Sequence, residues 1–251
     1  MIDVVIVATA IKTKFWKEYY LNLLKNNSSF HLVFCGNQKP NFKLPNNFTF
    51  LFSEEKPSKC VQNCYDFANK NLKSRFIMHT ADDFIFQENY IDKLIAGYEK
   101  NKLIYPNRPL MVTQLSIAPT GQYDRMALKD GDPLLGIGPL TTVENNNLIG
   151  GVDMRFNSVC WDMDRVYRFY ALGGIMIPLP ETECPLVKER TLDENTNYAW
   201  KSHHNKDMQT FNNLWTPKKT NNTIITNYYN GNNTFLEGTF SYKRTDDVHN
   251  Y

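Results

Sequence analysis

The chain has 251 residues, of which 42% are hydrophobic, 22% charged and 14% aromatic. This composition excludes an intrinsically disordered chain, a collagen-like fibre and a small disulfide scaffold. Because 28 Lys and Arg face 26 Asp and Glu, the net charge of +2 is too balanced for nucleic-acid binding by bulk electrostatics. An anionic partner would have to be bound locally.

The cysteines and the first residues point to one compartment. The five cysteines are odd in number, lie in apolar segments and lack the paired CxxC spacing of a structural zinc site. The chain begins Met-Ile-Asp-Val-Val-Ile-Val, with an acidic residue where a signal peptide has basic ones and an apolar run too short to cross a bilayer. We therefore expect a cytoplasmic protein, in the host cytoplasm if its source is viral, with no integral membrane segment.

Apolar β-rich runs alternate with helical patterns in the first half of the chain, which is typical of a mostly parallel sheet covered by helices. We expect strands at 4–9, 31–35, 48–52, 75–80 and 111–115, and helices with buried stripes at 15–24, 58–70 and 91–98. From 106 to 147 the pattern loosens, and beyond 191 the helical pattern is lost. One hairpin signal remains at Asn230-Gly231, and we interpret the end of the chain as a cap on the same domain.

Two adjacent aspartates, Asp82 and Asp83, follow the strand at 75–80. Ligands of open parallel sheets bind beyond the carboxyl ends of the strands, and this pair lies at such an end. Carboxylates are hard oxygen ligands that suit Mg²⁺ or Mn²⁺ beside a diphosphate. A solvated loop or a helix cap explains the pair about as well, so the motif needs corroboration.

A second motif lies in the later half of the chain. It reads Gly150-Gly151-Val152-Asp153-Met154-Arg155-Phe156, then Trp161-Asp162-Met163-Asp164, and then Arg168 and Gly173. The apolar spacing after Trp161 predicts a helix whose dipole keeps Asp162 ionised, and Asp164 and Arg168 are placed to form an ion pair one turn apart. An amphipathic helix accounts for the apolar stripe but not for two aspartates that open it after a double glycine.

Taken in order, the two motifs resemble those of GT-A-fold glycosyltransferases of the family 2 type. In that family an Asp-x-Asp or Asp-Asp metal motif is followed by Gly-Gly-Phe-Asp, then Arg-Phe, then Glu-Asp-x-Asp, Leu, Arg and Gly. This chain matches the later pattern at Gly150, Gly151, Asp153, Arg155, Phe156, Asp162, Asp164, Arg168 and Gly173. The resemblance implies an α/β, Rossmann-like GT-A domain over residues 1–210, with a mostly parallel sheet flanked by helices, and a C-terminal extension at 211–251 that packs on it.

The resemblance also implies roles for single residues. Asp83 would bind a Mn²⁺ or Mg²⁺ ion at the donor diphosphate, Asp82 would hold that metal or the ribose, and Asp162 would be the general base of an inverting hexosyl or pentosyl transfer. His203 or His204 would supply the last metal ligand. We expect a nucleotide-sugar donor of the UDP type. Its contacts are expected at Thr9, Ala10, Lys12 and Asn37, and those of the acceptor at Trp161, Asp164 and Arg168.

The chain departs from the family pattern at several positions. Thr80 stands where many members have another Asp, Trp161 replaces a Glu, and Cys35-Gly36-Asn37 takes the place of an acidic contact to the base or ribose. The donor is thereby left open. The ring of Trp161 is either a stacking surface for the acceptor or a half-buried core side chain.

Alternatives remain for the function as a whole. The acceptor is a soluble glycan or, as a minority hypothesis, a hydroxymethylated DNA base, and a non-catalytic GT-A-like module that binds nucleotide sugars or glycans is the main rival. A sugar nucleotidyltransferase is disfavoured because the loop at 9–14 has no glycine to wrap a triphosphate. Dinucleotide and P-loop sites are excluded because neither glycine motif follows a strand.

Overall fold

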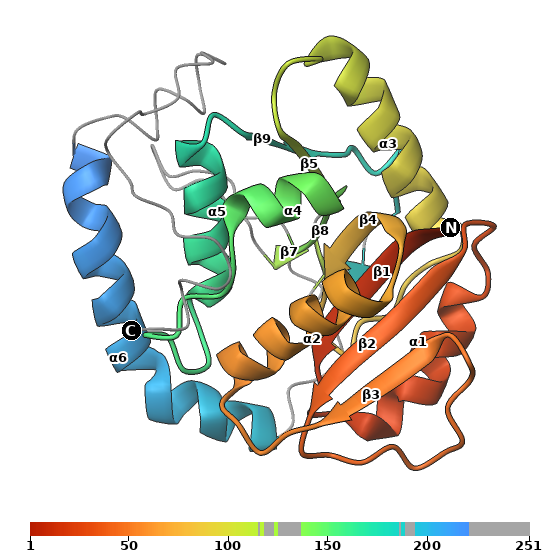
Figure 1. The fold of residues 1–251 in the computed structure, drawn as a ribbon, viewed down its shortest axis with the longest axis horizontal. Coiled ribbons are helices and arrows are strands. Elements are labelled where there is room, and N and C mark those ends of the chain that lie inside the picture. Colours follow the sequence, from red (N-terminus) through yellow and green to blue (C-terminus); the bar gives the residue numbers. More distant parts are fainter. Residues whose placement is uncertain (115, 118–122, 125–136, 186, 189–193, 221–251) are drawn as a thin grey trace.

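In the computed structural model, which describes residues 1–114, 116–117, 123–124, 137–185, 187–188 and 194–220, a seven-stranded sheet forms the centre of the molecule (Figure 1). Its strands are, in spatial order, β3 (Phe48–Phe52), β2 (Phe30–Gly36), β1 (Ile2–Thr9), β4 (Ser74–His79), β8 (Ile137–Thr142), β5 (Leu110–Gln114) and β9 (Ile175–Pro178). All neighbours are parallel except β8, which is antiparallel to both β4 and β5. The mixed α/β class with a mostly parallel sheet is confirmed.

Apolar side chains point to both faces of the sheet, as its central strands show. In β1, Val4, Ile6 and Ala8 pack on one face and Val5 and Val7 on the other, because successive strand residues alternate. Both faces are therefore covered by helices, which is the usual reason that parallel strands read as continuous apolar runs.

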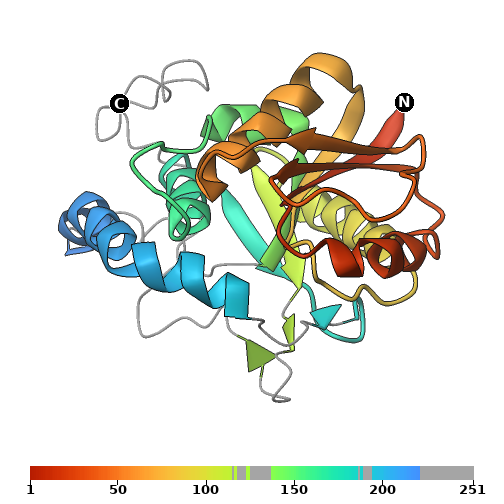
Figure 2. The same ribbon diagram turned by 90° about the horizontal axis from the view of Figure 1, so that it is seen from below.

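Two layers of helices cover the sheet (Figure 2). The short 3-10 turn η1 (Thr13–Phe15) leads into α1 (Trp16–Leu23), which shares one face with α3 (Tyr90–Ile104). The opposite face carries α2 (Pro57–Asn71), α4 (Val143–Ile149) and α5 (Trp161–Ala171). Each predicted strand and helix of the first half is present, with bounds that differ by a few residues.

The second half contains elements that the sequence pattern did not predict. They are β8, α4, β9 and a small sheet in the order β10-β6-β7, formed by β10 (Val187–Lys188), β6 (Ser116–Ile117) and β7 (Tyr123–Asp124). The expectation that the helical pattern is lost beyond 191 is wrong, because α6 (Glu194–Thr220) is a helix of 27 residues. It lies beside α5 at the outside of the molecule (Figures 1 and 2), and the expected domain limit at 210 falls within it.

Two further expectations concern the cysteines and the chain end. All five cysteines are buried and free of disulfides. In the part of the chain that the structure describes, no helix combines the length and the apolar character needed to cross a membrane. The predicted hairpin at Asn230-Gly231 and most of the predicted extension lie outside the described residues.

Candidate active site

The carboxyl ends of β1, β2 and β4 meet at one edge of the sheet, because these strands are parallel neighbours. The loop after β1 lies against the end of β2, where the Ala10 N–H donates to the carbonyl oxygen of Cys35 at 2.7 Å. A Cβ at Gly36 would lie 2.4 Å from the Ala10 carbonyl oxygen, so this close approach requires glycine. Of the predicted donor contacts, Ala10 is buried, Thr9 is half-buried and Asn37 is exposed at this edge.

Asp82 fixes the loop after β1. Its Oδ2 accepts hydrogen bonds from the backbone N–H groups of Ile11 (2.9 Å) and Lys12 (2.7 Å) and from Nε1 of Trp16 (2.8 Å). Burial raises the pKa of Asp82 to about 6, although the three donors act in the opposite direction. The Oδ2 atom of Asp82 is therefore occupied by hydrogen bonds within the protein, and only its Oδ1 atom remains to contact a ligand.

Asp83 forms a buried ion pair with Lys12. The ammonium of Lys12 contacts Asp83 Oδ2, and the two side chains are only 4% and 6% exposed. Lysine is almost never buried without a partner, and removal of either partner would leave an uncompensated charge inside the protein. The site thus already binds positive charge against Asp83.

Asp82 and Asp83, which we call the acidic doublet, suit one kind of metal binding. The described residues contain no group of three or more His, Cys, Asp or Glu side chains placed to hold a metal ion. Thr80, which replaces a third carboxylate, shares a hydrogen bond of 2.6 Å with the hydroxyl of Tyr19. Mg²⁺ is often held by one or two carboxylates together with substrate phosphates and water, and Asp83 with the remaining oxygen of Asp82 fits that mode. They do not form a cage that would hold an ion without a substrate.

Asp162 lies in the first turn of α5 and reaches solvent. Protein nevertheless surrounds it, and this burial raises the pKa of its carboxyl above the ordinary value of 3.8, against the lowering effect of the Met163 N–H. A raised pKa suits a general base, because the carboxylate is then a stronger base toward the proton that it takes.

His79 and Trp161 join the two motifs. His79 ends β4, Trp161 begins α5, and their rings pack edge to face with centroids 4.6 Å apart. Burial, assisted by Arg165, lowers the pKa of His79 to about 3, so this imidazole is neutral. The acidic doublet follows His79 closely and Asp162 follows Trp161 directly, so the contact joins the two chain segments that carry these carboxylates.

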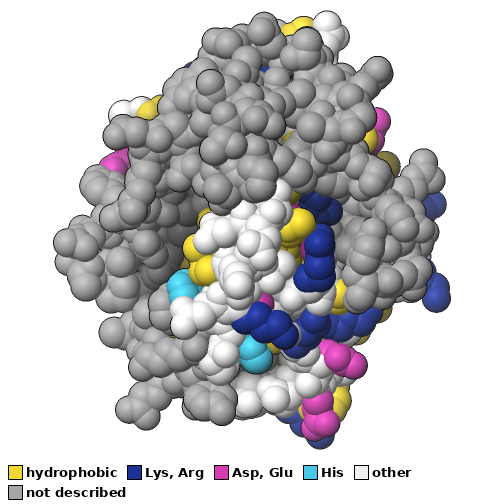
Figure 3. Space-filling model, turned by 90° about the vertical axis from the view of Figure 1, so that its left-hand side faces the viewer, with side chains coloured by type: hydrophobic (Ala, Val, Ile, Leu, Met, Phe, Trp, Pro, Cys, Tyr) yellow, Lys and Arg dark blue, Asp and Glu magenta, His cyan; other side chains and the backbone are white. Residues whose placement is uncertain are grey.

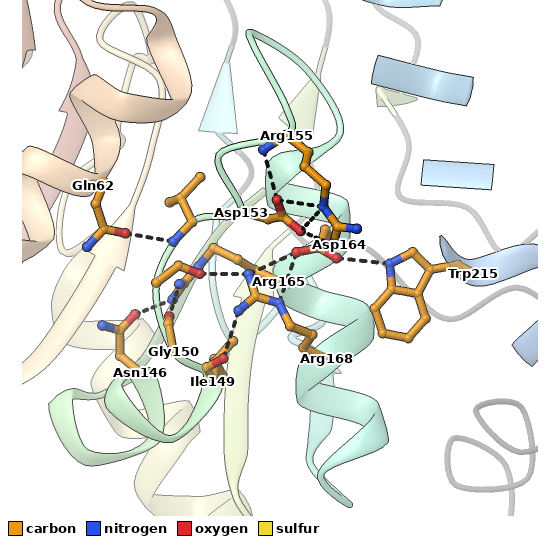
Figure 4. Close-up of polar contacts among 12 residues, drawn as sticks. Gln62, Asn146, Ile149, Gly150, Asp153, Arg155, Asp164, Arg165, Arg168 and Trp215 are labelled. Atoms are coloured by element: carbon orange, nitrogen blue, oxygen red, sulfur yellow. Dashed lines mark hydrogen bonds and ion pairs between the residues drawn. The ribbon is translucent and has the colours of Figure 1, made fainter. Parts of the chain in front are cut away.

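Two buried arginines hold the double-glycine segment against α5 (Figure 4). Arg168 pairs with Asp164, its Nε lying 2.9 Å from Asp164 Oδ2, and donates to the carbonyl oxygens of Ile149 (2.9 Å) and Gly151 (2.7 Å). Arg165 donates to the carbonyl oxygen of Gly150 and, at 2.6 Å, to Asn146 Oδ1. The predicted ion pair between Asp164 and Arg168 is confirmed.

The predicted acceptor contacts are buried. Trp161, Asp164 and Arg168 are 6%, 3% and 4% exposed. The ring of Trp161 packs on His79, and Asp164 Oδ1 accepts a hydrogen bond of 3.0 Å from Nε1 of Trp215. The polar groups of Asp164 and Arg168 thus bind other parts of the protein, which gives these two residues a structural role, and contact of the three residues with an acceptor stays a prediction.

The helix α6 contributes residues that the sequence reading missed. Asp207 is completely buried and accepts hydrogen bonds from the segment before α5, and Phe211 and Trp215 pack on Tyr167. Residues 207, 211 and 215 recur at the four-residue spacing of a helix face, which was the available signal.

His203 and His204 also lie on α6 and are half-buried. The view onto this side of the molecule shows Lys, Arg and His side chains gathered near its centre (Figure 3). The described residues do not bring His203 into a three-ligand group with the aspartates. Its role as a metal ligand stays a prediction.

Comparison with known proteins identifies the fold. No protein-family model matches the sequence, and no curated protein is significantly similar to it. The crystal structure of S. aureus TarS 1-349 superposes with a TM-score of 0.53 at 9% identity, over 91% of this chain and 81% of that chain. The crystal structure of S. aureus TarS gives a TM-score of 0.52 at 10% identity, over 80% of this chain and 38% of that chain. The chain therefore has a Rossmann-like GT-A fold.

Proposed function

We propose that the protein is an inverting glycosyltransferase that moves a sugar from a UDP-type nucleotide sugar to a hydroxyl group of a glycan. The observation that carries the proposal is the contact between His79 and Trp161, which joins the chain segments that carry the acidic doublet and Asp162. Sugar transfer needs positive charge at the leaving diphosphate and a base at the attacking hydroxyl. The glycosyltransferase-like fold supports this interpretation.

The donor would bind where the loop after β1 meets the doublet. The Lys12 ammonium is held at this point by Asp83 and can share its charge with the donor phosphates. Asn37 directly follows β2, is exposed and would contact the nucleoside. A Mn²⁺ or Mg²⁺ ion held by Asp83 and the remaining oxygen of Asp82 would neutralise charge that develops on the leaving nucleoside diphosphate.

Asp162 would act on the acceptor. Its carboxylate takes the proton of the acceptor hydroxyl as that oxygen forms a bond to the anomeric carbon. The bond between this carbon and the diphosphate oxygen breaks, and its electron pair leaves with the nucleoside diphosphate. Because the attack and the departure occur on opposite sides of the carbon in a single displacement, the configuration is inverted.

The variant Asp162→Asn tests the role of the base. We expect kcat to fall about 100-fold or more, as is usual for the loss of a general base, while donor affinity measured by calorimetry stays within about twofold. Glu144→Gln is the matched control, because Glu144 is also an exposed carboxylate in the first turn of a helix. Equal activity of Asp162→Asn and Glu144→Gln would refute the assignment.

The pH dependence gives a second test. Only the ionised carboxylate accepts a proton, so kcat/KM falls as the pH drops through the pKa of Asp162. Since burial raises that pKa, the acidic limb of the profile should lie above the ordinary aspartate value of 3.8. A limb at or below that value would show that another group limits the rate.

The donor, the metal ion and the acceptor can each be tested with the wild-type protein. Sugar release from a panel of UDP, GDP, TDP and CMP sugars, with Mn²⁺, with Mg²⁺ and with EDTA, identifies the donor and the ion. Gel shifts on plain and hydroxymethylated DNA at two salt concentrations test the DNA acceptor. The absence of both sugar release and metal-dependent nucleotide binding would instead indicate a non-catalytic binding module.

A further inference from the structure

The carboxylate of Asp207 holds the turn that leads into α5. Its Oδ1 lies 3.0 Å from both the backbone nitrogen and Nδ2 of Asn157. Its Oδ2 lies 3.1 Å from the Asn157 nitrogen, 2.8 Å from that of Ser158 and 3.0 Å from that of Val159. All of these groups donate to one carboxylate on α6, so three successive backbone amides are fixed by a helix that is distant in sequence.

The same turn is held from the other side by α2. The Ser58 N–H donates to the carbonyl oxygen of Asn157 at 3.1 Å, and the Ser58 hydroxyl donates to that of Phe156 at 2.8 Å. Thus α2 binds carbonyl oxygens of the turn, and α6 binds the backbone amide groups of the same turn. The position of the turn is determined by both helices together.

The turn ends in a conformation that needs this support. Cys160 has a φ of 64°, in the left-handed region that residues other than glycine rarely adopt. Such conformations persist where the surrounding structure over-determines them, and they cluster at functional sites. Cys160 is the N-cap residue of α5, and Asp162 lies in the first turn of that helix. A change in the backbone conformation of Cys160 would therefore move the Cα atom from which the Asp162 side chain projects.

We propose that Asp207 is a positioning residue for Asp162: by binding the amides of residues 157–159, it keeps Cys160 left-handed and aims the Asp162 carboxylate at the acceptor. This inference rests on the proposed function, in which Asp162 is the base. Asp207 itself is completely buried and belongs to α6, so it acts only through the turn.

The variant Asp207→Asn tests the proposal with little change in shape. In the wild type, the backbone N–H groups of residues 157–159 donate to the Asp207 carboxylate, an arrangement that we call the clamp. In the variant, the nitrogen of the side-chain amide would face some of these N–H groups, so at least one side of the clamp becomes repulsive. We expect kcat to fall by about 10- to 100-fold, the range for a misplaced catalytic group, while the KM for the donor stays within about twofold. A merely structural loss would lower the amount of folded enzyme and leave kcat per folded molecule unchanged.

Asp92→Asn is the matched control. Asp92 also accepts hydrogen bonds from two backbone amides and two side chains, those of Asn27 (2.8 and 3.2 Å) and Ser28 (2.8 and 2.5 Å). These contacts join α3 to the residues before β2, away from the edge of the sheet that carries the site. Asp92→Asn should leave kcat unchanged. An equal fall of kcat in both variants would overturn the proposal.

Rescue at Cys160 tests the route by which Asp207 acts. Glycine adopts the left-handed conformation at no steric cost, so Cys160→Gly should restore kcat by about threefold or more in the Asp207→Asn background and have little effect alone. No rescue would show that the turn does not transmit the effect, and the proposal would fail.

Hydrogen exchange separates this inference from the proposed function. Amides 157–162 should exchange faster in Asp207→Asn than in the wild type or in Asp92→Asn, whether or not the protein transfers sugar. If this difference is seen but the wild type has no transferase activity, the proposed function fails while the clamp stands. If the wild type is active and exchange at 157–162 is unchanged in Asp207→Asn, the clamp is refuted.

Discussion

Replacement of Asp82 by alanine should destabilise the protein, because this carboxylate binds three N–H groups of the loop after β1. The Lys12 amide and the Trp16 indole are buried with it. A buried donor left without a partner costs about 1–3 kcal/mol, so these two groups together predict a loss of about 2–6 kcal/mol in the free energy of unfolding. The third donor, the Ile11 amide, makes only a partly buried contact with Asp82, so its loss should cost less.

Asp82→Asn separates this anchoring role from charge. Its side-chain oxygen can still accept from the loop, and neutral hydrogen bonds are roughly half as strong as those to a carboxylate. We therefore expect about half of the loss seen with alanine. Urea unfolding followed by tryptophan fluorescence measures both variants, and calorimetric titration with UDP measures donor affinity. If the free energy of unfolding of Asp82→Ala were within about 0.5 kcal/mol of the wild-type value while UDP binding was lost, Asp82 would be a ligand contact and would not hold the loop after β1 in place.

Three further changes test other parts of the structure. Trp215→Phe removes the N–H donor to Asp164 but keeps an aromatic ring, so a loss of about 1.5–3 kcal/mol is expected in urea unfolding, the range for hydrogen bonds to charged groups; an unchanged midpoint would contradict the contact. Gly36→Ala places a methyl group against the backbone oxygen of Ala10 and should lower the thermal midpoint, whereas a midpoint equal to that of the wild type would show that the two loops can separate freely. Burial raises the pKa of Asp207, but the bound amides outweigh it and the pKa lies below the ordinary aspartate value. The resulting stability is complete above the unfolded pKa of about 3.9 and is lost as the pH falls through the folded value, so Asp207→Asn should flatten the acid limb of a stability profile and leave its slope near neutral pH unchanged.

The first half of the fold could be predicted from the sequence because its signals are local. The strand at 48–52 was placed with its observed bounds, and the helix at 58–70 within one residue of each end, since proline and apolar spacing mark these elements directly. The antiparallel strand β8 was missed because its sequence, Ile-Gly-Pro-Leu-Thr-Thr, contains the residues that usually mark turns. Its place in the sheet depends on pairing with β4 and β5, which no local pattern records.

The candidate site divides in the same way. Asp83 and Asp162 could be proposed as site residues because they stand in recognisable motifs after a strand and at a helix start, and their roles stay predictions. The burial of Asp164 could not be predicted, because Trp215, which donates a hydrogen bond to it, lies far along the chain on a helix whose apolar residues are separated by many polar ones. The clamp by Asp207 joins positions 157 and 207, and only the folded chain shows that they meet.

The position of β8 has a consequence for synthesis on the ribosome. Strands β1 to β4 are neighbours in the sheet, in the order β3-β2-β1-β4, and all four have emerged once residue 79 has been synthesised, so this half can assemble early. Its outer strand, β4, then has an open backbone edge until residues 137–142 arrive and cover it. Nascent chains that stall in between would expose a ready template for association with other chains, and chaperone demand should peak over that interval.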